Sequence, residues 1–187
     1  MGDKVKYPRA DAIKVAKELC DALRPVTDRL IVAGSLRRRK QMVGDVEILF
    51  VPKFVPRRVD FFSTENVSLA NEVLNDLLGR QILRHRPNVN GSEIWGEKNK
   101  LAVHVASGIP VDLFAATDSN WWNYLVCRTG SLEHNVKVAA AAQARGWRWN
   151  PYAAGFTDEQ GNLVRVTCEK DVFTYVGLPF LMPWQRI

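Results

Sequence analysis

The most constraining stretch of the sequence is DVEILFV at residues 45–51, which combines a strand-forming apolar pattern with two acids one residue apart. Side chains of a strand alternate between its two faces. Asp45 and Glu47 would therefore project from one face, about 7 Å apart given a rise of roughly 3.3 Å per residue, while Val46 would point into a core. Two carboxylates held side by side repel each other, so this pattern requires a nearby cation.

A third acid lies in a second apolar stretch, GIPVDLFAA at residues 108–116. Asp112 has apolar neighbours on both sides there, and an acid in a buried strand needs a partner. Three acids on adjacent strands could hold two Mg²⁺ ions that activate a hydroxyl for phosphoryl transfer. Two other interpretations stay open: a solvated Asp-x-Glu face, and a structural ion pair between Asp112 and a nearby arginine.

The residues before the first acid pair, GSLRRRK at 34–40, form a small turn followed by a cationic cluster. Gly34 would let the backbone approach a phosphate closely, Ser35 could donate a hydrogen bond, and a guanidinium spreads several hydrogen bonds over an oxyanion. A cationic run of this kind is also typical of a surface patch, or of a nucleic-acid contact without chemistry.

The apolar spacing of the chain predicts an α+β fold, with a mixed α/β lobe to about residue 118 and a smaller, mainly helical lobe after it. Ser68 is the expected cap of the second helix and Gly79 its end, and Gly146 and Gly177 are expected to end two later helices. Helices are predicted at 8–24, 69–78 and 136–145 and before Gly177, and strands at 29–34, 46–51, 101–106 and 109–116, the last two as a hairpin.

Composition narrows the class of protein. Lys and Arg number 26 against 20 Asp and Glu, which gives a net charge of +6 and favours a polyanionic partner such as nucleic acid. Three cysteines without metal-site spacing favour neither a disulfide framework nor a zinc site. Because no run has the roughly 18 apolar residues of a membrane helix and no signal peptide is visible, we expect a soluble, intracellular chain without a membrane partner.

Five stretches resemble, in order and spacing, the palm and thumb of family X DNA polymerases over nearly the whole chain: GSLRRRKQMVGDVEIL, PVDLF, RTGSLEHN, RGWRWNPY and EKDVFTYVGLPF. The resemblance implies a nucleotidyltransferase palm with a mixed β-sheet and flanking helices at residues 1–118 and a thumb domain at 119–187. It also implies two Mg²⁺ (or Mn²⁺) ions, a dNTP substrate and addition of dNMP to a DNA 3′-hydroxyl.

Carried over residue by residue, the resemblance implies that Asp45 and Glu47 bind both metal ions. Asp112 would bind the catalytic metal and accept the proton of the primer hydroxyl. The implied contacts to the triphosphate are Gly34, Ser35, Arg38 and Gly44; Thr129 and Gly130 would face the nucleotide sugar, and Asn135 would reach the base in the minor groove.

The chain departs from the family pattern at several positions. Glu47 stands where the family has Asp, so we expect altered rather than absent activity. Cys127 and Arg128 replace an aromatic pair that bears on the choice between ribose and deoxyribose, and Ala139 replaces an arginine that touches the template strand. Five basic residues are assigned to DNA phosphates: Lys98, Lys100, Lys137, Arg145 and Arg148. Five aromatic residues are assigned to the thumb core: Trp121, Trp122, Tyr124, Trp147 and Trp149. His104 is expected to be exposed, and His134 is expected to face DNA or solvent.

The leading hypothesis is a minimal palm-plus-thumb polymerase, expected to be monomeric, that fills short gaps or extends primers with low processivity at the site of DNA replication or repair. One alternative keeps the palm but transfers the nucleotide to RNA, to protein or to a small molecule. The other is a nucleic-acid-binding module with a decayed site.

Overall fold

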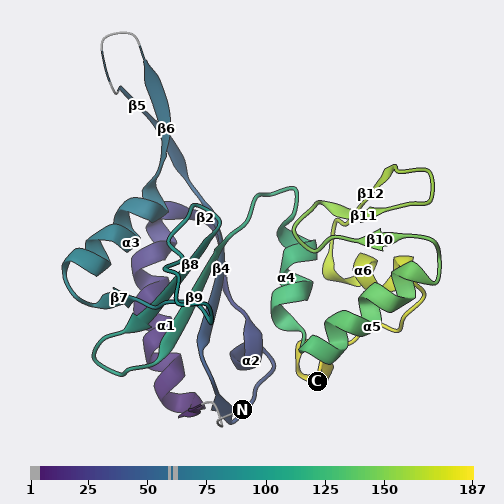
Figure 1. Ribbon diagram of the computed structural model, residues 1–187, viewed down its shortest axis with the longest axis horizontal. Coiled ribbons are helices and arrows are strands. Elements are labelled where there is room, and N and C mark those ends of the chain that lie inside the picture. The colour runs from purple at the N-terminus through teal and green to yellow at the C-terminus, as the bar shows by residue number, and fades with distance from the viewer. Residues whose placement is uncertain (1–4, 59, 61–62) are drawn as a thin grey trace. The chain divides into compact units, whose positions relative to one another are not determined.

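The computed structural model describes residues 5–58, 60 and 63–187 and divides the chain into two compact units (Figure 1). The first unit comprises the residues up to Val32 together with Gln41–Ala115, and the second comprises Ala33–Lys40 and Ala116–Ile187. The segment 33–40 therefore folds with the C-terminal part of the chain, although two strands of the first unit flank it in sequence. The assignment of 1–118 to a palm and 119–187 to a thumb stays a prediction.

The first unit is built on a five-stranded mixed sheet with the strand order β2-β4-β9-β8-β7. Within this sheet β4 (Val46–Pro52) runs parallel to β9 (Pro110–Ala115). The other pairs of the described strands are antiparallel and add β2 (Thr27–Val32), β8 (Asn99–His104) and β7 (Leu83–His85). The predicted mixed sheet and the β8–β9 hairpin are both confirmed.

Two helices pack against this sheet. Helix α1 (Arg9–Leu23), followed by the 3₁₀ turn η1 (Arg24–Val26), contacts β2 and β4, and α3 (Leu69–Gly79) contacts β7. The alternation expected for β4 is present only at its start, where Val46 and Ile48 are buried while Glu47 between them is half-buried; the following residues up to Pro52 are all buried. Apolar packing under the central strands thus leaves the carboxylate on the opposite face.

The ends of the helices follow the predicted signals with one exception. The Ser68 hydroxyl caps α3 by accepting a hydrogen bond from the backbone N–H of Asn71 at 3.3 Å, as expected. The predicted stop at Gly79 is wrong, because α3 includes this glycine and the left-handed residue that turns the chain is Gln81, at φ +59°. The turn closes there because the Gln81 amide donates to the Leu78 carbonyl. Gly146 and Gly177, at φ +71° and +73°, end their helices as predicted.

Two strand pairs of the first unit were not predicted. The hairpin of β5 (Phe54–Arg58) and β6 (Thr64–Ser68) extends away from the sheet (Figure 1). Near the N-terminus, β1 (Tyr7–Pro8) pairs with β3 (Met42–Val43). Both pairs are too short, or too polar, to show a clear alternation in the sequence.

The second unit combines short helices with a small three-stranded sheet. Its helical elements are α2 (Gly34–Arg37), α4 (Trp121–Thr129), α5 (Leu132–Gln143), α6 (Glu169–Tyr175) and the 3₁₀ turn η2 (Pro183–Gln185), and its strands are β10 (Arg148–Trp149), β11 (Gly155–Thr157) and β12 (Leu163–Arg165). The predicted aromatic core is confirmed. Tyr124 and Trp121 are buried, and the other tryptophans assigned to it pack against a core of Val126, Val138, Ala142, Phe156, Val166, Val172, Phe173 and Val176.

Two polar residues of β8 lie in the interior, contrary to expectation. His104 was expected to be exposed, but its ring is buried between the Ser107 hydroxyl at 2.8 Å and the Glu18 carboxylate at 3.3 Å. Lys100 was assigned to DNA phosphate, yet it is only 3% exposed and its Nζ donates to the Gly96 carbonyl at 2.7 Å. Burial lowers the pKa of the Lys100 ammonium. Both assignments were wrong because these side chains point to the same face of β8 as the buried Ala102.

No helix in the part of the chain that the structure describes is long and apolar enough to cross a membrane.

The position of Gly79 inside α3 generates a stability prediction. An alanine Cβ at Gly79 would meet no atom within 4 Å, and its φ is not positive, so Gly79→Ala should raise the free energy of unfolding by roughly 0.5–1 kcal/mol. Gly146→Ala is the contrasting variant, because φ there is +71° and the new Cβ would lie 2.5 Å from the Glu159 carboxylate. Urea denaturation should show opposite signs for the two variants, and a loss of stability in Gly79→Ala would contradict the assignment.

Candidate active site

The strand register of the first unit brings two of the three predicted acids together. In the parallel pairing of β4 with β9, Glu47 lies directly opposite Asp112, on strands that are about 4.8 Å apart. Asp45 comes directly before β4, two residues from Glu47, and all three acids are half-buried. The carboxylates of Glu47 and Asp112 therefore share one face of the sheet, as the alternation predicts.

The Asp112 carboxylate forms an ion pair with Arg86, the residue that follows β7. The two side chains are 19% and 29% exposed, so the pair is largely shielded from water. This contact is the structural ion pair that the sequence left open as an alternative for Asp112. No sequence signal distinguishes Arg86 from its basic neighbours, because the contact arises from strand pairing over 26 residues of chain.

The donor chemistry of these acids suits a hard divalent cation, which takes carboxylate oxygens. The Arg86 guanidinium already supplies a positive charge at one of the three acids, Asp112. As the side chains lie, no three His, Cys, Asp or Glu groups among the described residues gather closely enough to hold one metal ion. In chemistry, the three acids fit the predicted ions.

In the second unit, the predicted phosphate turn begins at Gly34. Its φ of +57° favours glycine, because other residues reach the left-handed region only with strain. The next residue, Ser35, has a buried hydroxyl with no hydrogen-bond partner among the described residues. A buried hydroxyl without a partner is costly, so this one is suited to a ligand oxygen.

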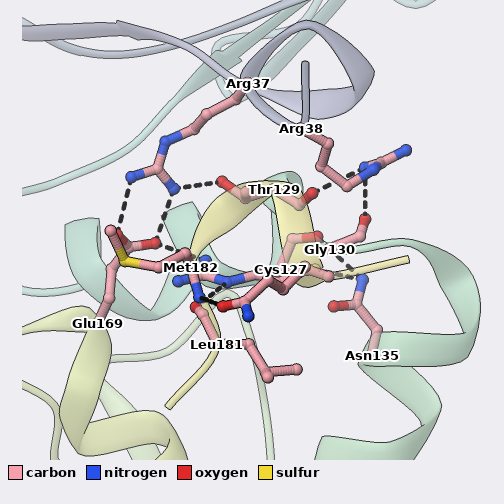
Figure 2. A network of polar contacts seen from close by, with 11 residues as sticks. Arg37, Arg38, Cys127, Thr129, Gly130, Asn135, Glu169, Leu181 and Met182 are labelled. Carbon is pink, nitrogen blue, oxygen red and sulfur yellow. Dashed lines mark hydrogen bonds and ion pairs between the residues drawn. The ribbon is translucent and has the colours of Figure 1, made fainter. Parts of the chain in front are cut away.

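Arg37 and Arg38 follow this turn and bind the segment that ends α4 (Figure 2). Arg37 donates to the Thr129 hydroxyl at 2.6 Å. Arg38 donates from Nη1 to the carbonyls of Thr129 and Gly130, at 2.7 and 3.1 Å. The two arginines thus tie the predicted phosphate turn to the Thr-Gly segment, which the family resemblance implies faces the nucleotide sugar.

Arg37 also enters a buried charge network that the sequence analysis missed. It binds the Glu169 carboxylate through two hydrogen bonds of 2.7 and 2.8 Å (Figure 2). Arg186 donates to the same carboxylate at 2.7 Å. Burial alone would raise the pKa of Glu169, but the Arg37 hydrogen bond and the Arg186 charge outweigh it, so the pKa lies below its usual value. Glu169 therefore stays ionised and holds both arginines in place.

Gly130 is required by the packing of the helix that follows it. A Cβ there would lie 2.3 Å from the His134 ring and 2.6 Å from the Asn135 Oδ1 atom. Asn135 was predicted to reach the nucleotide base; in this structure its amide donates to the Cys127 carbonyl at 2.9 Å, and the base contact stays a prediction. His134, expected to face DNA or solvent, is instead buried against Phe173.

Two further predicted positions have distinct surroundings. Gly44 is half-buried, with no atom within 4 Å of the place where a Cβ would stand, so its phosphate contact stays a prediction. Arg128, one of the two departures from the family's aromatic pair, lies over the rings of Tyr124 and Tyr152, with distances of 5.3 and 5.7 Å from the guanidinium carbon to the ring centres. The Arg128 guanidinium therefore stacks on two aromatic rings at this position.

The buried His134 generates a prediction for the pH dependence of stability. Burial, followed by the nearby cations Arg186, Lys137 and Arg38, lowers its pKa from 6.5 to about 4. Because the unfolded chain then binds the proton more readily, this contribution to stability is complete above pH 6.5 and is lost as the pH falls towards 4.

Lowering the pH from 7.5 to 5 should therefore cost about 2 kcal/mol at His134. His134→Phe keeps an aromatic ring against Phe173 and removes the titration, and it leaves no bond unmade, since the His134 Nε2 atom has no partner among the described residues. Urea denaturation at the two pH values should show a smaller loss of stability in the variant. Equal losses in both proteins would contradict the assignment.

Comparison with known proteins adds independent findings. The family model of the DNA polymerase beta thumb matches residues 124–187. The DNA polymerase/3′-5′ exonuclease PolX of Bacillus subtilis (strain 168) is 25% identical over 181 residues, which are 95% of this chain and 28% of that relative. The chain thus spans little more than a quarter of the length of this relative.

Solved structures of Leishmania infantum polymerase beta share the fold. The ternary P/T complex has a TM-score of 0.72 and 19% identity, covering 98% of this chain and 77% of that one. The ternary gap complex has a TM-score of 0.73 and 18% identity, covering 97% and 71%. The chain thus shares its fold with these polymerase beta structures, and its residues 124–187 match the model of the polymerase beta thumb.

Proposed function

We propose that the chain is a DNA polymerase that adds dNMP from dNTP to a DNA 3′-hydroxyl with the help of two divalent metal ions. The observation that carries the proposal is the β4–β9 register, which sets Glu47 beside Asp112 while Asp45 lies directly before β4. The thumb match and the PolX similarity support the same reaction.

Each carboxylate has a distinct proposed task. Asp45 and Glu47 would hold both ions through their oxygens, with Glu47 bending back to offset its extra methylene. Asp112 would hold the catalytic ion and accept the proton of the 3′-hydroxyl. When bound, Mg²⁺ or Mn²⁺ would supply the activation of that hydroxyl and the stabilisation of the leaving oxygens.

Residues of the second unit, and Gly44 of the first, are the proposed nucleotide contacts. The unpartnered hydroxyl of Ser35 would donate to a phosphate oxygen, the backbone at Gly34 and Gly44 would allow close approach, and the charge of Arg38 would stabilise the phosphates. Because Arg38 also holds the Thr129 and Gly130 carbonyls, it would couple the phosphates to the segment proposed to face the sugar. Asn135 would read the base after releasing the Cys127 carbonyl.

DNA is the proposed partner, held by phosphate contacts from exposed basic side chains. Lys98, Lys137, Arg145 and Arg148 are all exposed and remain candidates. Lys100 is withdrawn from this set because its ammonium is buried. Short-gap filling in DNA repair with low processivity is the proposed use of the reaction, and a monomer is the proposed state.

One competing function has a specific observation in its favour. The ion pair between Asp112 and Arg86 is what a nucleic-acid-binding module with a decayed catalytic site would show. In that case the acids would serve only to fix the sheet, and the protein would bind DNA without extending it.

Primer extension separates the two functions. With Mg²⁺ or Mn²⁺ and dNTPs, the protein should extend primed and gapped DNA, and Asp112→Asn or Glu47→Gln should lower the rate by roughly a hundredfold to a thousandfold, because each removes a ligand of the reacting centre. Asp76→Asn is the matched control, since it removes an equal charge from an exposed position on α3. Retained DNA binding without any extension would replace the polymerase with the binding module.

The same assay tests the choice of acceptor. Extension of a DNA 3′-end, with no transfer to RNA or to free small hydroxyl compounds, is the expected result. Addition that ignores the template base would indicate a terminal-transferase-like reaction, and transfer to RNA, protein or small molecules in place of DNA would overturn the proposed substrate.

A further inference from the structure

Arg86 lies in line with the two central acids across the sheet. Its backbone amide donates to the Leu101 carbonyl at 3.0 Å, Leu101 pairs with Asp112 across β8 and β9, and Asp112 pairs with Glu47 across β9 and β4. Backbone hydrogen bonds and strand register therefore set the position from which the guanidinium reaches Asp112. An arginine on a surface loop, with its backbone not held by neighbouring strands, would not be positioned in this way.

The contact is also less exposed to water than an ordinary surface ion pair. The Asp112 side chain is 19% exposed and that of Arg86 29%, so water screens the two charges only in part. A divalent cation that approached Asp112 would compete for the same carboxylate and would be repelled by the guanidinium. Metal and Arg86 therefore oppose each other at this residue.

We propose that Arg86 is a positioning residue that holds Asp112 in the metal-free protein and releases it when a divalent cation binds. The affinity of the acids for metal is then set by the strength of this ion pair. The inference rests on the proposed function, because it assumes that Asp45, Glu47 and Asp112 bind divalent cations.

Metal binding to the full chain without DNA or nucleotide tests the inference directly. Titration with Mn²⁺, followed by the electron paramagnetic resonance signal of the free ion, should show that Arg86→Gln binds Mn²⁺ roughly fivefold or more tightly than the unaltered protein, a size typical of coupling between two linked binding events. Arg84→Gln is the matched control, because it removes an equal charge from an exposed position on β7, two residues away. It should leave the affinity unchanged.

A second variant keeps the test decisive if Arg86→Gln does not fold. Arg86→Lys retains the charge but loses the planar fork of the guanidinium, so its affinity for Mn²⁺ should lie between those of the unaltered protein and Arg86→Gln. Without metal, the melting temperature of Arg86→Gln should fall below that of Arg84→Gln, because the acids lose their cation, and Mn²⁺ should restore it. The Mg²⁺ concentration for half-maximal primer extension should fall in the same variant.

The outcomes separate this inference from the proposed function. If the unaltered protein binds Mn²⁺ and Asp112→Asn weakens the binding, but Arg86→Gln and Arg86→Lys bind it no more tightly, the role of Arg86 is overturned and the polymerase proposal stands. If the unaltered protein binds no Mn²⁺ and Asp112→Asn changes nothing, the metal site of the proposed function fails, and the role of Arg86 fails with it.

Discussion

The parallel pairing of β4 with β9 is the constraint on which the candidate site depends. It sets Glu47 opposite Asp112, and a slip of one residue would place an apolar neighbour of Asp112 there instead. The register is held from the other face, where Val46 and Ile48 are fully buried. The apolar residues that fix this register also place the Glu47 and Asp112 carboxylates side by side. Because the two negative charges repel each other, a nearby cation is needed to stabilise them.

In both units a carboxylate that is shielded from water is paired with arginine. In the first unit one guanidinium binds Asp112. In the second, Glu169 is held by two, from Arg37 and Arg186, and their combined effect keeps its pKa low in spite of burial. The two sites differ in what else could take the place of the guanidinium. Glu169 is a single acid enclosed by two cations, whereas Asp112 has one guanidinium and a second carboxylate, that of Glu47, beside it.

The parts of the fold and the site that could be predicted from the sequence are those formed by residues close together in the chain. The strands around Glu47 and Asp112 and the caps at Ser68 and Gly146 follow from local patterns, and all were predicted. The partner of Asp112 was foreseen only as an arginine, because nothing local marks Arg86. The period-two alternation of β8 also gave the wrong position for His104. A polar residue in an alternating strand was expected to face solvent, but His104 is buried because its ring finds a polar partner, Glu18, on helix α1.

The turn at 34–40 shows why a cationic run is a poor guide to surface charge. Arg37 and Arg38 read as a patch for phosphates, yet their hydrogen bonds run inward, to Thr129, Gly130 and Glu169. Arginine suits this task because its planar fork can serve several acceptors at once, whereas a lysine at either position would satisfy fewer of them. The net charge of +6 therefore includes arginines whose guanidinium groups bind groups of the same chain. The attraction for a polyanion must come from the exposed basic residues that remain, so the segment most suggestive of phosphate binding owes its shape first to contacts with its own chain.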